Sequence, residues 1–162
     1  MQVTISDAIR YIGVDDKDID LFESQYVVPE GVSYNSYVIL DEKIAVMDTV
    51  DARGMEVWED KLLQTLNGKN PDYLIISHLE PDHAGSIGRM VELFPEVKLV
   101  ASAKAIAMLP QFFEDKLDAQ EKIAVKEGEE LSLGTHTLVF YMAPMVHWPE
   151  VMVTYEKSEK VL

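Results

Sequence analysis

The chain has 162 residues, of which 48% are hydrophobic, and 29 acidic side chains oppose 14 basic ones, for a formal net charge of −15 at pH 7. This length and composition suffice for one globular domain with a core, and the acidic balance argues against nucleic acids and anionic membranes as partners. The absence of cysteine excludes disulfides, a thiolate metal site and a cysteine nucleophile, so any metal must be held by nitrogen and oxygen.

The first third of the chain predicts β-strands joined by tight turns. Short strands are expected over residues 9–14 and 25–28. A longer strand over 33–40 is rich in Tyr, Val and Ile, and residues 44–47 are expected to pair with it as a hairpin. The chain therefore opens with antiparallel structure.

From residue 55 the apolar period changes to that of a helix. Residues 55–66 place their large apolar side chains on one helical face, and Asn67 with Gly68 supplies a stop. Beyond it, strands alternate with helices. The expected strands are 73–76 and 98–101, short and apolar like buried parallel strands, and the expected helices are 87–94 and 103–113. Pro110 is expected to end or kink the last helix.

The last third returns to strands, over 137–142 and 151–155, with the start of another at 161–162. The charged run 114–130 is expected to be a solvated surface with one possible strand at 123–125, and His136 to face solvent. Hairpins, then strand–helix repeats, then hairpins imply a layered α/β protein with a mixed sheet.

Four potential metal ligands directly follow the predicted buried strand 73–76: His78, Glu80, Asp82 and His83. The carboxyl ends of parallel strands are where α/β proteins place their sites. Side chains alternate along an extended segment, so His78 and Glu80 are expected to point to the same side, with Pro81 helping to keep the segment extended. Asp82 and His83 are neighbours and diverge, which suits two adjacent metals better than one.

Two imidazoles and two carboxylates suit iron, manganese or zinc, and neither copper(I) nor an iron–sulfur cluster. The alternative is a helix-capping segment, with Asp82 as the cap and both histidines on the surface. Four ligand-type residues in six positions favour the metal site.

The pattern His78-x-Glu80-x-Asp82-His83 resembles the metal motif of the metallo-β-lactamase superfamily in its flavodiiron variant. The hydrolase branch carries histidine at the position of Glu80. The hairpin at 34–50 is similar to the family's opening hairpin, and residues 145–150 resemble its second ligand loop. The resemblance runs from about residue 9 to the end of the chain. It implies a metallo-β-lactamase-like αββα sandwich, an α/β fold with mixed sheets and helices outside.

The resemblance also implies a non-haem diiron centre that reduces dioxygen to water or nitric oxide to nitrous oxide. One iron would be held by His78, Glu80 and His147, and the other by Asp82 and His83. A carboxylate at Glu80 is a hard anionic donor that suits ferric iron and redox chemistry. Without the resemblance, His147 reads equally well as an exposed loop residue.

Asp48 resembles an aspartate that orients ligands without touching the metal, and it reads equally well as a turn residue ending its strand. Tyr26 and Trp148 either border the substrate pocket or pack against neighbours.

The family pattern includes a bridging aspartate, a further histidine and a flavodoxin-like domain with FMN, none of which falls within residues 1–162. We therefore expect these residues to be a truncated, N-terminal portion of a metallo-β-lactamase-like domain, inactive alone, with an unpaired sheet edge. Such a chain is expected to associate with copies of itself or with the missing half. In the parent protein, a rubredoxin-like or flavin donor would supply electrons.

Two other functions compete: a metallohydrolase of the same superfamily, disfavoured by Glu80, and a remnant that serves only for association. No apolar run approaches the ~18 residues of a membrane span. The N-terminus lacks the basic start and apolar core of a signal peptide, so a cytoplasmic protein is expected.

Overall fold

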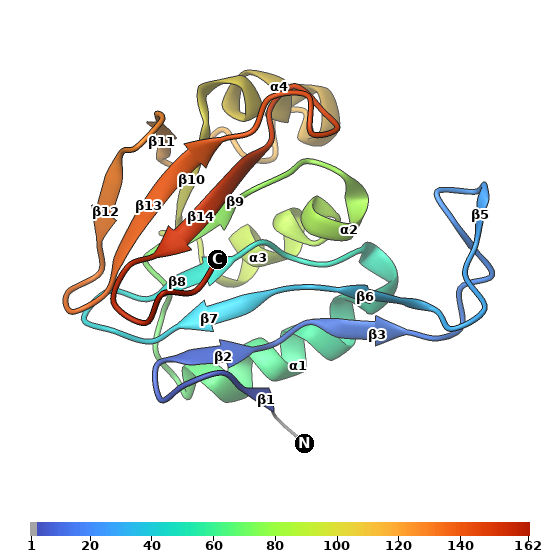
Figure 1. The fold of residues 1–162 in the computed structure, drawn as a ribbon, viewed down its shortest axis with the longest axis horizontal. Coiled ribbons are helices and arrows are strands. Elements are labelled where there is room, and N and C mark those ends of the chain that lie inside the picture. Colours follow the sequence, from blue (N-terminus) through green and yellow to red (C-terminus); the bar gives the residue numbers. More distant parts are fainter. Residues whose placement is uncertain (1–2) are drawn as a thin grey trace.

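The structure, a computed structural model, describes residues 3–162 (Figure 1). Met1 and Gln2, which the predicted domain includes, lie outside the described residues. Over 3–162 the largest sheet has seven strands, in the order β1 (Val3–Thr4), β2 (Ile9–Tyr11), β7 (Tyr37–Ile39), β8 (Ala45–Met47), β9 (Tyr73–Ile76), β10 (Lys98–Ser102) and β11 (Lys122–Val125). Strands β8 to β11 run parallel and the others antiparallel, so the sheet is mixed as predicted.

Smaller sheets and helices complete the described part. A three-stranded antiparallel sheet consists of β12 (Glu130–Ser132), β13 (Thr137–Met142) and β14 (Met152–Glu156). Two ribbons pair β3 (Val14–Asp16) with β6 (Val32–Tyr34), and β4 (Leu21–Phe22) with β5 (Tyr26–Val27). The helices are η1 (Ala52–Gly54), α1 (Met55–Leu66), α2 (Pro81–Ala84), α3 (Ile87–Leu93) and α4 (Ala103–Phe113).

Two cores lie on opposite faces of the large sheet. Strand residues such as Leu74 point to the helices and pack with Trp58 of α1 and Met90 of α3. The alternate residues, such as Ile75, point the other way and pack with Phe140 of the small sheet. Alternation of side chains along each strand thus gives three layers, helix–sheet–sheet. These correspond to three layers of the expected αββα sandwich.

Local chemistry explains the best-predicted helix. The α1 helix spans the predicted 55–66 and ends at Asn67, whose left-handed backbone lets its N–H donate to the carbonyl of Leu63. The α4 helix starts at the cap Ser102, whose hydroxyl accepts from the N–H of Ala105. It continues through Pro110 to the predicted end at Phe113, so proline does not end this helix, and the expected alternative of a kink stays a prediction.

The predicted strands 9–14 and 33–40 each split in two. The chain leaves the large sheet at Ile12 and rejoins it at Ser36, whose carbonyl accepts from the N–H of Ile12. Ser36 is fully buried, and its hydroxyl donates to the carbonyl of Asp48 and accepts from the indole N–H of Trp58. These contacts divide each predicted strand between the sheet and the β3–β6 ribbon.

The expectation for Pro81 is confirmed: Glu80 before it is extended, and Pro81 itself is the first residue of α2, where its fixed φ and missing N–H suit a helix start. Two further expectations are corrected. The run 114–130 is not all solvated surface, because it ends in β12 and buries Leu117. The strand expected at 161–162 is an isolated bridge from Val161 to Glu156 of β14.

His136 does not face solvent as expected. It is 9% exposed, its Nδ1 lies 2.8 Å from Asp41 Oδ2, and its Nε2 lies 3.2 Å from Glu159 Oε1. Asp41 lies in the β7–β8 turn of the large sheet and His136 in the β12–β13 turn of the small one. The contact therefore ties the two sheets together at one end.

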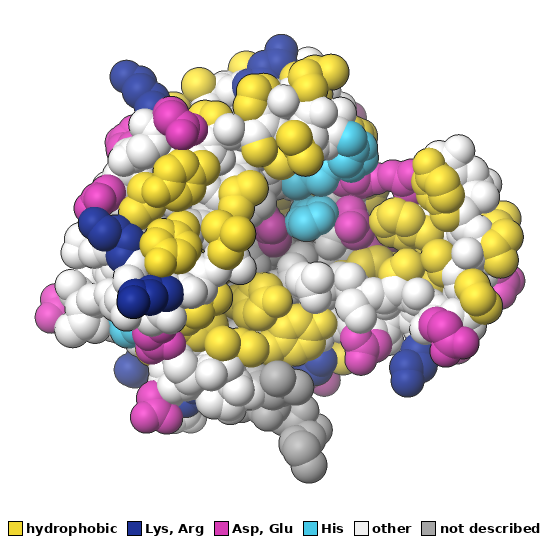
Figure 2. All heavy atoms as spheres, in the orientation of Figure 1, with side chains coloured by type: hydrophobic (Ala, Val, Ile, Leu, Met, Phe, Trp, Pro, Cys, Tyr) yellow, Lys and Arg dark blue, Asp and Glu magenta, His cyan; other side chains and the backbone are white. Residues whose placement is uncertain are grey.

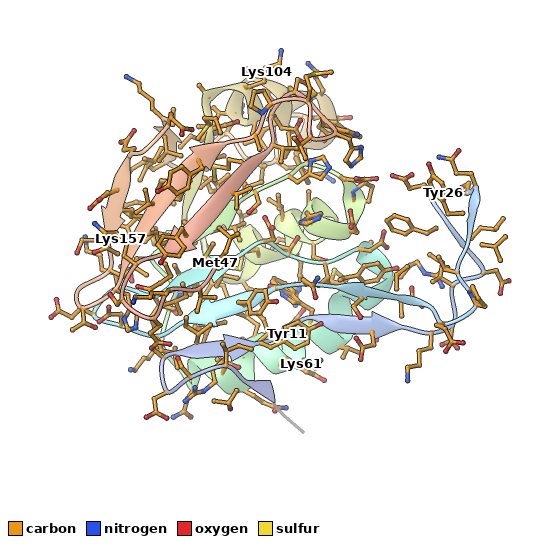
Figure 3. All side chains as sticks on the ribbon, viewed as in Figure 1. Tyr11, Tyr26, Met47, Lys61, Lys104 and Lys157 are labelled. Atoms are coloured by element: carbon orange, nitrogen blue, oxygen red, sulfur yellow. The ribbon has the colours of Figure 1, made fainter. Side chains whose placement is uncertain are left out.

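A cleft of about 380 Å³ lies between the sheets and is lined mainly by apolar side chains, among them Ile39 and Met47 of the large sheet and Leu138 and Met152 of the small one. Met47 is labelled in Figure 3. No helix within residues 3–162 is long and apolar enough to cross a membrane.

Candidate metal centre

His78 follows β9 at the carboxyl edge of the parallel strands. All four residues of β9 are buried, and the carbonyl of Ser77 accepts from the N–H of Met152. The Nδ1 of His78 lies 2.7 Å from Oε1 of Glu150, which also accepts from the N–H of Leu79 at 3.0 Å. Because this carboxylate can only accept, the His78 Nδ1 carries the proton, and the lone pair of Nε2 faces the site.

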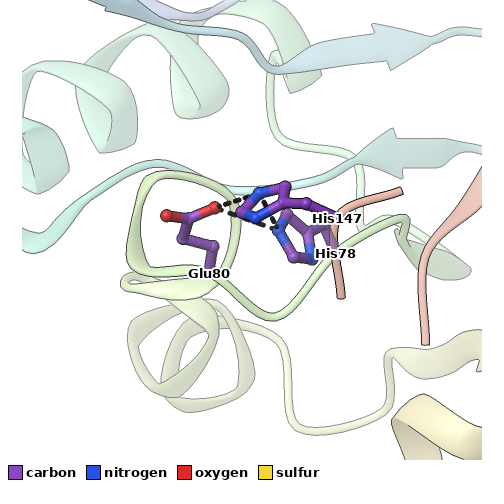
Figure 4. A group of neighbouring side chains, drawn as sticks. All are labelled: His78, Glu80 and His147. Atoms are coloured by element: carbon purple, nitrogen blue, oxygen red, sulfur yellow. Dashed lines mark hydrogen bonds and ion pairs between the residues drawn. The ribbon is translucent and has the colours of Figure 1, made fainter. Parts of the chain in front are cut away.

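Glu80 and His147 converge on that Nε2 (Figure 4). The Oε2 of Glu80 lies 3.0 Å from His78 Nε2 and 2.9 Å from His147 Nε2, and the two imidazole nitrogens are 3.3 Å apart. One donor atom from each residue lies within 4.8 Å of the others, so the three side chains can hold a single cation. His147 comes from the β13–β14 loop, so the group spans both sheets.

Asp82 and His83 lie beside this group on α2. His83 Nδ1 is 3.0 Å from Asp48 Oδ2, which leaves its Nε2 for another partner, and that Nε2 is 3.6 Å from Asp82 Oδ2. The rings of His78 and His83 are 5.4 Å apart. Burial lowers the pKa of His83, but the carboxylates of Asp48, Asp82 and Glu80 outweigh burial and raise it to about 9. The negative charge of these carboxylates therefore favours a cation at this position, and on the His83 ring that cation is a proton.

Asp48 is a turn residue whose side chain also contacts His83. It ends β8 in a left-handed turn conformation at φ 51°, which aspartate tolerates better than most residues. That turn lets Oδ1 accept from the N–H of Ser77 at 2.6 Å while Oδ2 contacts His83. The turn residue is thus also the one that orients His83.

The donor set fits a metal ion. Oδ1 of Asp82 and Oε2 of Glu150 are buried without a hydrogen-bond partner, a costly state for carboxylate oxygens that a nearby cation relieves. Burial raises the pKa of Glu80, and the neighbouring Glu23 and Asp82 raise it further. Two or three imidazoles among hard oxygens match iron, manganese or zinc.

The capping alternative is wrong, because Asp82 lies within the first turn of α2 and the cap position is Glu80, which makes no side-chain capping bond. The structure therefore brings His78, Glu80, Asp82, His83 and His147 into one pocket. Sequence reasoning missed the contact of Glu150 with His78. The only available signal was an acidic residue three positions after His147, which is too common to interpret.

The site forms part of a pocket of about 500 Å³. Its outer wall is the β4–β5 hairpin, which contributes Phe22, Glu23 and Tyr26. Tyr26 thus borders the pocket, and Figure 2 shows histidine and acidic side chains gathered in the hollow between hairpin and body. Trp148 packs instead, with its ring 5.2 Å edge-on to His78 and 6.0 Å from Phe112.

Comparison with known proteins gives consistent matches. Residues 32–162 match a family described as "ODP family beta lactamase". The chain is 36% identical over 161 residues to the nitric oxide reductase of Moorella thermoacetica, and 36% identical over 163 residues to the rubredoxin-oxygen oxidoreductase of Megalodesulfovibrio gigas. These alignments cover 99% and 100% of this chain but 40% of each relative.

The crystal structure of the flavodiiron protein from Giardia intestinalis superimposes with a TM-score of 0.89 at 27% identity, covering 96% of this chain and 37% of that one. The expected metallo-β-lactamase-like layering is thereby confirmed. The chain spans 40% or less of the length of each of these three proteins.

Proposed function

Because the chain belongs to the ODP family of β-lactamase-like domains, we propose that it is the metal-binding part of a flavodiiron oxidoreductase that reduces dioxygen to water, nitric oxide to nitrous oxide, or both. The observation that carries this proposal is the convergence of His78, Glu80 and His147 around one point, with Asp82 and His83 beside it. The relatives named for nitric oxide and oxygen reduction support the same reaction class.

We assign the ligands as two adjacent groups. His78, Glu80 and His147 hold one iron, and Asp82 and His83 the other; the irons supply the capacity to exchange electrons with a small diatomic substrate. Glu150 and Asp48 fix the ring orientation and tautomer of His78 and His83, respectively. The carboxylate of Glu80 adds negative charge that favours the higher oxidation state of a bound iron.

Complete turnover belongs to a longer polypeptide in this proposal. The parent protein would add FMN on a flavodoxin-like domain and draw electrons from a rubredoxin-like or flavin donor, and it would work in the cytoplasm. The apolar cleft between the sheets supports association with further polypeptide, since its exposed apolar surface is stabilised when covered. We expect residues 1–162 alone to bind metal and to have no reductase activity.

Metal analysis tests the proposal. The purified chain, loaded anaerobically with ferrous iron and desalted, is expected to retain iron, and His78→Ala to lose most of it. His136→Ala is the matched control, because it removes an imidazole that makes no contact with the site. Circular dichroism checks that each variant is folded. Equal iron retention in both variants would refute the assignment, and zinc retention with esterase activity would favour the hydrolase.

A further inference from the structure

The β4–β5 hairpin carries an acidic side chain into the wall of the metal pocket. Its turn includes Glu23 and Ser24, both with left-handed backbone conformations at φ 51° and 60°. Phe22 anchors the hairpin by packing against the helix-side core, whereas Tyr26 and Val27 remain exposed. The hairpin projects from the body on the side where α2 lies (Figure 1). This attachment keeps the turn near the site, and the exposed Glu23 side chain accepts one long hydrogen bond, from Gln25 Nε2 at 3.4 Å.

Glu23 meets the candidate metal ligands directly. It lines the pocket that also contains His78, Glu80, Asp82 and His147. Its carboxyl group lies close to that of Glu80 in this lining, and the two carboxyl groups shift each other's pKa. Two carboxyl groups in contact repel each other unless a proton or another cation lies between them. No Lys or Arg is among the described residues that line this pocket, so imidazoles are the only positively chargeable side chains that its lining offers to these carboxyl groups.

We propose that Glu23 is an additional carboxylate for the cation held by His78, Glu80 and His147, and that metal binding closes the β4–β5 hairpin over the site. This inference rests on the metal-binding part of the proposed function and is independent of the redox reaction. Glu23 lies outside the three-residue donor group, so a side-chain rotation with a small hairpin movement brings its oxygen to the metal. An exposed glutamate makes this adjustment at little cost.

The hairpin gives the site a donor that does not depend on the two sheets. His78 and His83 are held by Glu150 and Asp48, respectively, whereas the hydrogen bond to Glu23 comes from Gln25 of its own hairpin. Metal occupancy should therefore order residues 21–27 more than any other exposed segment. That effect would not arise if Glu23 were only one of many acidic residues on an acidic surface.

Titration with Mn²⁺, followed by the electron paramagnetic resonance signal of the free ion, tests the proposal on the 162-residue chain. Glu23→Gln is expected to weaken Mn²⁺ binding about tenfold, the lower range for loss of a group that supports a metal site. Glu30→Gln is the control, because it removes the same charge from an exposed position outside the pocket. Glu23→Asp keeps the charge but shortens its reach, so it is expected to weaken binding as well.

Amide hydrogen exchange over residues 21–27, with and without Mn²⁺, gives a second readout. The metal is expected to slow exchange there in the wild type and in Glu30→Gln, but not in Glu23→Gln. Equal affinities for Glu23→Gln and Glu30→Gln, or wild-type affinity for Glu23→Asp, would overturn the inference. In that case, loss of Mn²⁺ binding in His78→Ala would still support the metal site formed by His78, Glu80 and His147. Failure of the wild type to bind Mn²⁺ would overturn both.

Discussion

Replacing Glu150 by glutamine should weaken metal binding while leaving the stability of the metal-free chain nearly unchanged. The side chain is completely buried, its Oε1 accepts from His78 Nδ1 and from the N–H of Leu79, and its Oε2 has no partner. In Glu150→Gln the amide oxygen still accepts both bonds, so the geometry around His78 is kept. What disappears is the negative charge that makes the His78 imidazole a stronger donor to a metal.

The magnitudes follow from these contacts. Loss of a carboxylate behind a metal-binding histidine weakens affinity about 10- to 100-fold, or about 1.4–2.8 kcal/mol. Without metal, the gain from removing an uncompensated buried charge is offset by the cost of an amide N–H₂ at the partnerless Oε2 position, so the free energy of unfolding should change by no more than about 1 kcal/mol. Glu150→Ala is the contrast, because it leaves two buried N–H donors without an acceptor, at about 1–3 kcal/mol each.

Urea unfolding of the metal-free chain, together with Mn²⁺ titration of the same preparations, measures both quantities. The expected pattern is weaker binding with intact stability for Glu150→Gln, and loss of both for Glu150→Ala. The reasoning fails if Glu150→Gln keeps wild-type affinity, or if it destabilises the metal-free chain as much as Glu150→Ala does.

The remaining predictions concern the second ligand pair and the contact between sheets. Asp48→Asn should lower retained iron towards half of the wild-type amount, because His83 loses the charge that orients it while His78, Glu80 and His147 are unchanged. A colorimetric iron assay of the desalted protein measures this, and unchanged iron retention would contradict the assignment. Burial lowers the pKa of His136, but Asp41 and Glu159 outweigh burial and raise it above 6.5. The folded-state pKa therefore exceeds the unfolded one, so this stabilisation is complete below about pH 6.5 and is lost as pH rises through the folded-state pKa. Urea unfolding from pH 5.5 to 9 measures this effect. The free energy of unfolding of the wild type should exceed that of His136→Gln at low pH, and the difference should shrink as pH rises. A difference that is constant with pH would contradict this account.

The spacing of apolar residues in the sequence was sufficient to predict a helix or strand wherever that element is determined by its own residues. The bounds of α1 follow from its apolar face and from Asn67, and β9 from four consecutive apolar residues. The split of the strand predicted at 33–40 could not be read in this way. It depends on the hydroxyl of Ser36 meeting Asp48 and Trp58, which lie 12 and 22 positions away.

The same distinction holds for the site. His78 to His83 could be recognised because four ligand types follow one strand, and His147 because its loop resembles a known one. Glu150 meets His78 across 72 positions, and His136 meets Asp41 across 95. The packing of the two sheets determines which partner such a polar residue meets, and therefore its role. No pattern of neighbouring residues in the sequence predicts that partner.

The origin of the ligands on two different sheets has a mechanical consequence. His78 and Glu80 extend from β9 of the large sheet, whereas His147 is carried by the loop between β13 and β14 of the small one. An ion held by all three is a cross-link between layers, alongside the hydrogen bond from Met152 to Ser77. By linkage, metal at 100 times its dissociation constant adds about 2.7 kcal/mol to the docked state. Conversely, sliding of one sheet over the other would separate His147 from His78 and Glu80, so the packing of the apolar cleft would affect how tightly an ion is held by all three.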